Sequence, residues 1–173
     1  MLGDDGDNSI QVSRSGSDSH HKEVVILVNE GLLFVPIHTG IDANAVQKVL
    51  IDGGEGDDRI GVQGAWPAFL DGGAGNDTVT GSGAVDHLRG GAGHDFVAGY
   101  GNADVLYGDA GDDQLWGMGG EDKLFGGGDQ DVLLGHQSND YLDGGNGYDI
   151  ADGGQGFDTA TACELLANVE DVK

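Results

Sequence analysis

The chain has 173 residues, of which 31 are acidic and seven are Lys or Arg, so its formal net charge is −24. This balance argues against nucleic-acid binding, which needs a basic surface, and against attraction to an anionic membrane. No apolar run approaches the roughly 20 residues of a membrane span. Because Cys163 is the single cysteine, an internal disulfide and a thiolate zinc cluster are also excluded.

Residues 1–71 contain both prolines and two β-branched apolar runs. The runs at 24–28 and 32–35 are separated by Asn29-Glu30-Gly31, which predicts a β-hairpin with a three-residue turn. Strand-like sequence also leads into Gly53 and into Gly72, and these two glycines are 19 residues apart. We therefore expect residues 1–71 to form irregular β-coils with an inserted hairpin.

Residues 72–161 consist of ten nine-residue repeats with no shift of phase. Position 1 is always Gly, and position 8 is Val or Leu in the first eight repeats, then Ala. Position 6 is always Asp: Asp77, Asp86, Asp95, Asp104, Asp113, Asp122, Asp131, Asp140, Asp149 and Asp158. Positions 1 to 6 favour a turn, and positions 7 to 9 favour a short strand whose position-8 side chain faces inward. Two repeats then complete one coil, and neighbouring coils stack at the ~4.8 Å spacing of β-strands.

These repeats resemble the glycine- and aspartate-rich nonapeptides of the RTX, or hemolysin-type, calcium-binding family. Looser copies occur at 53–61 and at 3–11. The resemblance implies an all-β fold, a right-handed parallel β-roll or β-helix solenoid with two repeats per coil. It also implies bound Ca²⁺, which accepts six to eight oxygen ligands in irregular geometry. One ion in each gap between stacked turns would give up to about ten ions.

The resemblance further implies which groups hold the ions. Position-6 side chains of two stacked turns would bind together with main-chain carbonyls of positions 1 to 4. The implied side chains are those of Asp58, the ten repeat aspartates and, as a weaker neutral substitute in the earliest copy, Asn8. The implied carbonyl donors lie in Gly53, Glu55, Gly72, Gly73, Ala74, Gly75, Gly90, Gly91, Ala92, Gly93, Gly108, Asp109, Ala110, Gly111, Gly126, Gly127, Gly128, Asp129, Gly144 and Asn146.

The turns fall on two edges of the predicted roll. The first edge carries the turns that begin at Gly53, Gly72, Gly90, Gly108, Gly126 and Gly144, and the second edge those that begin at Gly81, Gly99, Gly117, Gly135 and Gly153. On the second edge, position 4 is Ala84, Asn102 or Ser138 in three turns, although a left-handed backbone favours Gly. We expect ordered calcium on the first edge and weaker occupancy on the second.

Residues 162–173 leave the repeat and are predicted to cap the open end of the coil. The chain as a whole looks like a calcium-binding module that folds on binding calcium, taken from a larger secreted bacterial protein. By resemblance it would be extracellular and exported by type I secretion, with other domains of the parent protein as partners. We expect no enzyme activity, because a periodic ladder of equivalent carboxylates lacks the two unlike environments of an acid–base pair.

Outward-facing aromatic and apolar residues leave an alternative open. Phe96, Trp116, Val132, Leu134 and Ile150 are predicted on one sheet, and Val105, Tyr107, Phe125 and Tyr141 on the other. Such a surface could dock a polysaccharide or a protein, or it could simply shield a thin coil.

Overall fold

The computed structural model describes residues 9–12, 48–169 and 171–172, with only the backbone of 9–12 and 171–172. The predicted hairpin at 24–35 and Asn8 lie outside the described residues. The described part contains strands and turns and no helix, so no helix that could cross a membrane is found in it.

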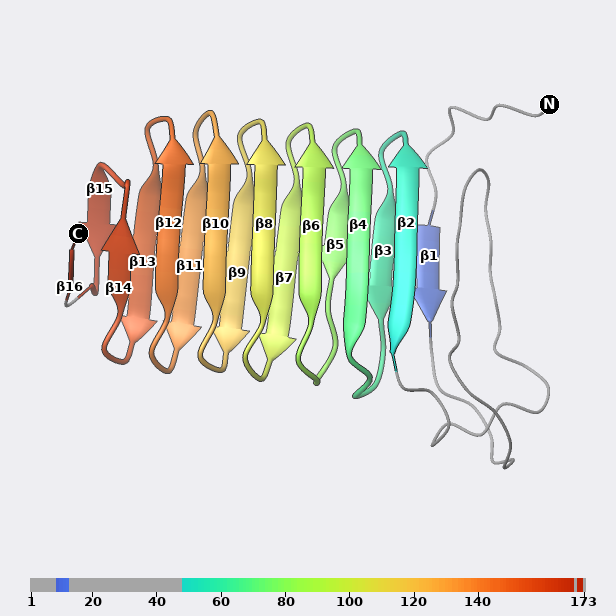
Figure 1. The fold of residues 1–173 in the computed structure, drawn as a ribbon, viewed down its shortest axis with the longest axis horizontal. Helices are drawn as coiled ribbons and strands as arrows, with labels where there is room; N and C mark the ends of the chain where they lie inside the picture. The colour runs from blue at the N-terminus through green and yellow to red at the C-terminus, as the bar shows by residue number, and fades with distance from the viewer. Residues whose placement is uncertain (1–8, 13–47, 170, 173) are drawn as a thin grey trace.

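Within the described residues, sixteen strands form two eight-stranded parallel sheets, and consecutive strands alternate between the two sheets. The odd-numbered sheet contains β1 (Ser9–Val12), β3 (Arg59–Val62), β5 (Thr78–Thr80), β7 (Phe96–Gly101), β9 (Gln114–Gly119), β11 (Val132–Gln137), β13 (Ile150–Gln155) and β15 (Leu165–Ala167). The even-numbered sheet contains β2 (Val49–Glu55), β4 (Ala68–Ala74), β6 (His87–Ala92), β8 (Val105–Ala110), β10 (Lys123–Gly128), β12 (Tyr141–Asn146), β14 (Thr159–Thr161) and β16 (Asp171–Val172). Figure 1 shows the resulting right-handed solenoid, with the two sheets as its two layers. The all-β parallel roll expected from the sequence is confirmed.

The core is a double row of position-8 side chains between the two sheets. Each repeat contributes one residue, from Val79 to Ala160, and all ten are 0–1% exposed. Strand register follows the repeat, since Leu106 pairs with Leu124 and Leu124 with Leu142. The regular 18-residue offset therefore places equivalent residues in columns along the roll.

The first described coils depart from this offset. Strand β2 pairs with β4 at an offset of 19 residues, as Leu50 opposite Phe69 shows. Gly83 N–H donates to the Gly64 carbonyl at the same offset of 19, whereas Ala68 N–H donates to Asp86 Oδ1 at 18. The extra residue thus lies between Gly64 and Ala68, in the turn that buries Trp66.

Both ends extend the sheets beyond the repeats. At the start, β1 pairs in parallel with β3, with Ser9 opposite Arg59. At the end, β15 pairs with β13 and β16 with β14. Within the segment 162–173, which was expected to cap the coil, Leu165–Ala167 and Asp171–Val172 therefore add one more strand to each sheet.

Candidate metal centre

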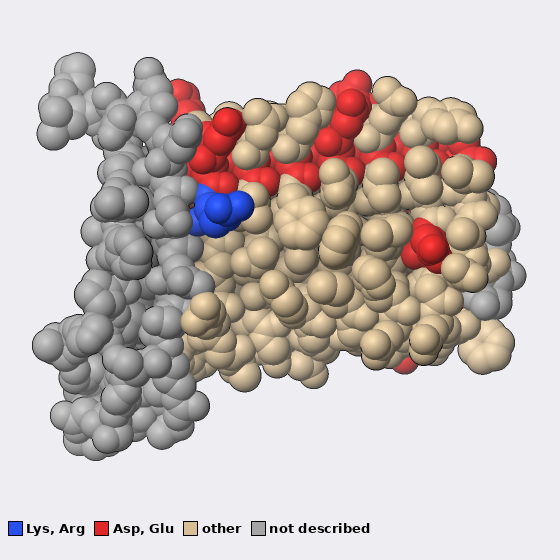
Figure 2. All heavy atoms as spheres, turned by 180° about the vertical axis from the view of Figure 1, so that it is seen from behind, with Lys and Arg blue, Asp and Glu red and all other residues tan. Residues whose placement is uncertain are grey.

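Each position-6 aspartate lies where a turn meets the next strand. Asp77 directly precedes β5 and Asp86 directly precedes β6, so successive repeats place their carboxylates at opposite edges. All eleven are buried, with exposures of 0–3%: Asp58, Asp77, Asp86, Asp95, Asp104, Asp113, Asp122, Asp131, Asp140, Asp149 and Asp158. In Figure 2, acidic side chains follow one edge of the roll, where the turns after the even-numbered strands lie.

One oxygen of each carboxylate ties consecutive coils together. The Asp77 N–H donates to Asp95 Oδ1 at 2.7 Å, and the Asp95 N–H donates to Asp113 Oδ1 at 2.8 Å. The same bond recurs along the second edge, for example from Asp104 N–H to Asp122 Oδ1 at 2.8 Å. The aspartate side chain thus bonds to the coil that precedes it.

The other carboxylate oxygen has no hydrogen-bond partner. This is true of Oδ2 in Asp77, Asp95, Asp104, Asp113, Asp122, Asp131, Asp140 and Asp149. Leaving a buried carboxylate oxygen without a donor or a cation is costly, so its presence in so many equivalent turns needs an explanation.

Six of these eight oxygens converge with a carbonyl oxygen of the next coil, namely those of Asp77, Asp113, Asp122, Asp131, Asp140 and Asp149. Asp77 Oδ2 and the Gly90 carbonyl oxygen lie 2.4 and 2.5 Å from the point where a Cβ on Gly72 would stand. At Gly108 the corresponding distances, to Asp113 Oδ2 and the Gly126 carbonyl oxygen, are 2.4 and 2.6 Å. Position 1 must therefore be Gly, because a methyl group would fill the space on which the oxygens converge.

Carbonyl groups of neighbouring turns point into the same gap. The Gly73 carbonyl oxygen is directed toward Gly91 in the following turn, and the Gly75 carbonyl oxygen toward Gly93, while the Gly90 carbonyl oxygen is directed back toward Gly72. Positions 2 and 4 of one turn and position 1 of the next thus contribute oxygens between two stacked turns. The structure brings these carbonyl groups together with the aspartates as the family pattern implies, and their role as ligands stays a prediction.

This arrangement fits a hard cation held by oxygen alone. In the described part of the chain, no three His, Cys, Asp or Glu side chains lie close enough to hold an ion by themselves. An ion would therefore need main-chain carbonyls as well as carboxylates. Such an irregular all-oxygen set suits Ca²⁺, whereas Mg²⁺ demands regular octahedral geometry and Zn²⁺ favours nitrogen and sulfur.

Without cations the carboxylates hold their protons unusually tightly. Burial is the main cause that raises the pKa of Asp113 to about 7 and that of Asp104 to about 8. The backbone hydrogen bond to each group lowers its pKa in part, and the charges of neighbouring aspartates raise it further. A column of ionised carboxylates is therefore unfavourable unless positive charge lies between them.

The two edges differ in backbone strain. Positions 2 and 4 have positive φ in all the repeat turns except that of residues 81–86, and on the first edge they are mostly Gly, with Asp109 (φ 78°) and Asp129 (φ 76°) as exceptions. On the second edge, five non-glycine residues adopt positive φ: Tyr100, Asn102, Met118, His136 and Ser138. Side chains rarely tolerate this conformation, so the second edge stores more strain.

Asp86 differs from the other buried aspartates. Its Oδ2 accepts a hydrogen bond from the Ser82 N–H at 2.6 Å, and Ser82 Oγ lies 3.4 Å from its Oδ1. Neither Ser82 nor Ala84 has positive φ, so this turn follows a different path. The Asp86 carboxylate, predicted to bind calcium, thus accepts a hydrogen bond from its own turn with the oxygen that has no partner in eight of the other repeats.

Glu164 was not among the predicted site residues. Its Oε2 accepts a hydrogen bond from the Asp149 N–H at 2.7 Å, as the position-6 aspartates do for the coil before them. The repeat phase places Ala167 rather than Glu164 eighteen residues after Asp149. The available signal was a lone carboxylate in the otherwise uncharged stretch 162–169.

Comparison with known proteins agrees with this geometry. The profile of the RTX calcium-binding nonapeptide repeat matches in four copies over residues 69–97, 98–133 and 126–160. These ranges span 69–160, or 92 of the 173 residues. The chain belongs to the RTX calcium-binding repeat family. Searches of curated proteins and of solved structures gave no significant match.

Membership of this family indicates which cation the columns of carboxylates would bind. RTX repeats bind calcium as a family and are typical of secreted bacterial proteins. The chain is thus a calcium-binding repeat module, and the buried aspartates and facing carbonyls are the groups of this RTX roll that would hold the ions.

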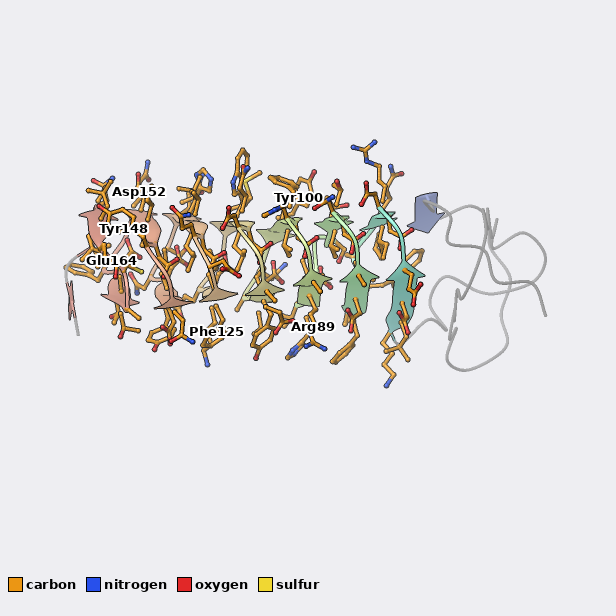
Figure 3. All side chains as sticks on the ribbon, turned by 90° about the horizontal axis from the view of Figure 1, so that it is seen from above. Arg89, Tyr100, Phe125, Tyr148, Asp152 and Glu164 are labelled. Atoms are coloured by element: carbon orange, nitrogen blue, oxygen red, sulfur yellow. The ribbon has the colours of Figure 1, made fainter. Side chains whose placement is uncertain are left out.

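The outward aromatics form two different surfaces. On the odd-numbered sheet, Trp116 is half-buried, with its ring edge-on to Phe96 (centroids 5.1 Å apart) and to His136 (5.8 Å), and Ala98 in the same row is buried. Trp116 therefore packs against its neighbours. On the even-numbered sheet, Tyr107 is 39% exposed and stacks on Phe125 at 5.0 Å. Figure 3 shows Phe125 and Arg89 projecting from this face.

Proposed function

We propose that the chain is a calcium-induced folding module of a larger secreted, extracellular bacterial protein. Its role is structural rather than catalytic. The proposal is supported chiefly by the buried carboxylate oxygens that lack hydrogen-bond partners and face carbonyl groups of the next coil. Cations between the coils would satisfy these oxygens and offset the repulsion among them.

The same reasoning gives a division of labour along the chain. Residues 72–161 would hold most of the ions, 1–71 would begin the roll and 162–173 would close it. Calcium-poor cytosol would keep the chain unfolded for export, by type I secretion, and calcium outside the cell would fold it. This follows because metal-binding free energy becomes folding free energy when the unfolded chain has no preformed site.

Circular dichroism of the full chain tests the proposal. We expect a disordered spectrum in EDTA and a β-rich spectrum in millimolar Ca²⁺. Mg²⁺ at the same concentration is the matched control and should leave the chain disordered, since it adapts poorly to irregular oxygen sites. A spectrum that is the same in EDTA and in calcium would contradict the proposal.

A second candidate function, docking of a neutral polysaccharide, is favoured by a groove on the outer face of the even-numbered sheet. The groove has a volume of about 400 Å³, and its lining includes the apolar side chains of Leu50, Phe69 and Tyr107. Phe69 and His87 stack in parallel there, with ring centroids 4.8 Å apart and planes 3° apart. Because the stacked rings cover one face of each other, the apolar contact open to a sugar comes from the exposed parts of Phe69 and Tyr107.

Charged groups at the groove suit sugar hydroxyls. Arg89 pairs with Asp109 and lies 3.7 Å from Asp71, so donors and acceptors lie beside the rings. The net charge of −24 disfavours a polyanion. We therefore expect Tyr107→Ala to weaken retention of the calcium-loaded chain by hydroxyethyl cellulose in affinity electrophoresis, with the packed Trp116→Ala as control. Equal retention of both variants, or retention by polygalacturonate alone, would contradict this candidate.

A further inference from the structure

The last repeat turn on the first edge is not followed by another repeat turn on that edge. This turn spans residues 144–149, and Asp149 is fully buried with an Oδ2 that no donor reaches. In each earlier gap of the repeat array on this edge, the next repeat supplies a carboxylate at position 6. In the gaps that follow Gly72, Gly108 and Gly126 it also supplies the carbonyl of position 1. Here the chain leaves the nonapeptide pattern at Ala162.

The non-repeat segment nevertheless supplies both groups. The Ala162 carbonyl oxygen and Asp149 Oδ2 lie 2.2 and 2.6 Å from the point where a Cβ on Gly144 would stand. One coil earlier, at Gly126, the carbonyl oxygen of Gly144 and the Oδ2 of Asp131 lie 2.5 and 2.4 Å from the equivalent point. The two gaps therefore have the same pair of converging oxygens.

Glu164 takes the place of the missing aspartate. Its Oε2 accepts the Asp149 N–H at 2.7 Å, whereas Asp149 Oδ1 accepts the Asp131 N–H at 2.9 Å. Strand register agrees, because Leu165 pairs with Ile150 and so Glu164 stands opposite Asp149. Figure 3 shows Glu164 between the two layers at the C-terminal end, near the turn that carries Tyr148.

A shorter turn explains why glutamate is needed. Only Ala162 and Cys163 separate Thr161 from Glu164, and Ala162 adopts a left-handed backbone with φ 50°. The N–H groups of Glu164 and Leu165 both donate to the Asp149 carbonyl, at 3.0 and 3.2 Å, which holds the short turn against the last coil. Glutamate has one methylene more than aspartate, and its carboxylate reaches the Asp149 N–H from this shorter turn.

We infer that Asp149, Glu164 and the Ala162 carbonyl form an additional, terminal calcium site that fastens the C-terminal segment to the roll. The site is distinct from the nonapeptide sites, because two of its three groups come from outside the repeats. It rests on the proposed function, since it requires the roll to bind calcium. Carboxylate, carboxylate and carbonyl are ligands that calcium accepts, and water can complete a more open shell.

Cys163 provides a local readout of this site. It lies between Ala162 and Glu164, is partly buried, and its Sγ lies 3.2 Å from the Thr161 carbonyl oxygen. If calcium orders the turn, the thiol becomes protected from N-ethylmaleimide as the site fills. As the single cysteine of the chain, it reports on no other region.

The test compares Glu164→Gln with Glu121→Gln in the full chain. Both remove one negative charge, and Glu121 is an exposed residue of the second edge. Maleimide labelling of Cys163 and circular dichroism are followed together over a buffered calcium series. For Glu164→Gln we expect the midpoint of Cys163 protection to rise by about tenfold, while the main folding transition stays within about twofold of the control. The midpoint of labelling is compared rather than its rate, because the pKa of the thiol is raised mainly by burial and also by nearby carboxylates, among them Glu164, so the substitution itself changes thiol reactivity.

The outcomes separate the two proposals. A normal folding transition with equal Cys163 midpoints in both variants would overturn the terminal site alone. If the unmodified chain shows no calcium-dependent transition at all, the proposed function fails and the terminal site fails with it. A count of bound ions that falls by one in Glu164→Gln, and stays unchanged in Glu121→Gln, would support the terminal site directly.

Discussion

At the scale of single residues, position 1 and position 6 of each repeat depend on one another. Gly108 does not have positive φ, so backbone freedom is not the reason for glycine there. A Cβ at Gly108 would stand 2.4 Å from Asp113 Oδ2. Glycine is required because the carboxylate and the next carbonyl occupy the space that any side chain would need.

Gly108→Ala tests this dependence, with Gly128→Ala as the matched control. A Cβ at Gly128 meets its nearest atom, the Asp109 carbonyl oxygen, at 3.7 Å, and the residue does not have positive φ. We expect Gly108→Ala to destabilise the calcium-loaded roll by about 1–3 kcal/mol or more, the usual cost of overpacking. Urea denaturation in calcium measures this, and an equal loss in the control would contradict the explanation.

Removing a carboxylate should have effects that depend on its edge. Asp113 lies between Asp95 and Asp131 on the first edge, and its removal affects the gaps on both sides. We expect Asp113→Asn to raise the calcium midpoint of folding by about tenfold. Asp140→Asn, beside the strained His136 and Ser138, should raise it less. A larger shift for Asp140→Asn in calcium titrations would reverse the assignment of strong and weak edges.

At the scale of elements, the turns on each edge form a column in which every carboxylate faces another coil. The pKa of Asp104 is raised to about 8, of Asp113 to about 7 and of Asp131 to about 6, mainly by burial. A raised carboxyl pKa means that the metal-free roll binds protons more tightly than the unfolded chain. Its stability is therefore highest below the ordinary aspartate pKa and falls as pH rises through about 6 to 8.

The pH dependence of calcium-induced folding follows from this competition. Calcium must displace protons from these carboxyl groups, so the calcium midpoint should rise as pH falls from about 8 to about 5. In EDTA the same acidification should increase β-structure rather than decrease it. Circular dichroism at several pH values checks both trends. A calcium midpoint that does not change with pH would show that the carboxyl groups are ionised before the metal binds.

At the scale of the whole molecule, charge opposes folding until cations arrive. The net charge of −24 acts on a chain whose core receives one position-8 side chain from each repeat. So thin a core gives little apolar burial against the repulsion within the carboxylate columns. At neutral pH we therefore expect the chain to fold only when calcium ions are bound.

Small-angle X-ray scattering should detect this change in dimensions. An unfolded chain of 173 residues has a radius of gyration of roughly 40 Å, and a compact one is well below about 25 Å. We expect the larger value in EDTA and a sharp decrease over a narrow calcium range, because each coil stabilises its neighbours. A gradual decrease, one ion at a time, would contradict cooperative folding of the roll.

The repeat phase made much of this structure predictable. Once Asp77 and Val79 recur every nine residues, the strand positions, the inward row and the two edges follow, and the 19-residue spacing of Gly53 and Gly72 correctly indicated one extra residue. Two features depend on geometry that no spacing shows. Ser82 bonds to Asp86 because its turn takes another path, and Glu164 replaces an aspartate because a short turn and a longer side chain reach the same point.

The columnar register has a mechanical consequence. Each coil is hydrogen-bonded to the neighbouring coil, 18 residues further along the chain. Tension applied to the two ends of the roll is therefore carried in series by a set of similar interfaces between coils. In the described residues, the strands at either end of the two sheets pair on one side only, so an end coil would separate first. Each rupture then frees 18 residues, or about 60 Å of extended chain. The calcium concentration would set the force needed to rupture each coil, whereas the length of chain released by each rupture would stay the same. The roll would therefore act as a tether whose mechanical strength depends on the surrounding calcium concentration.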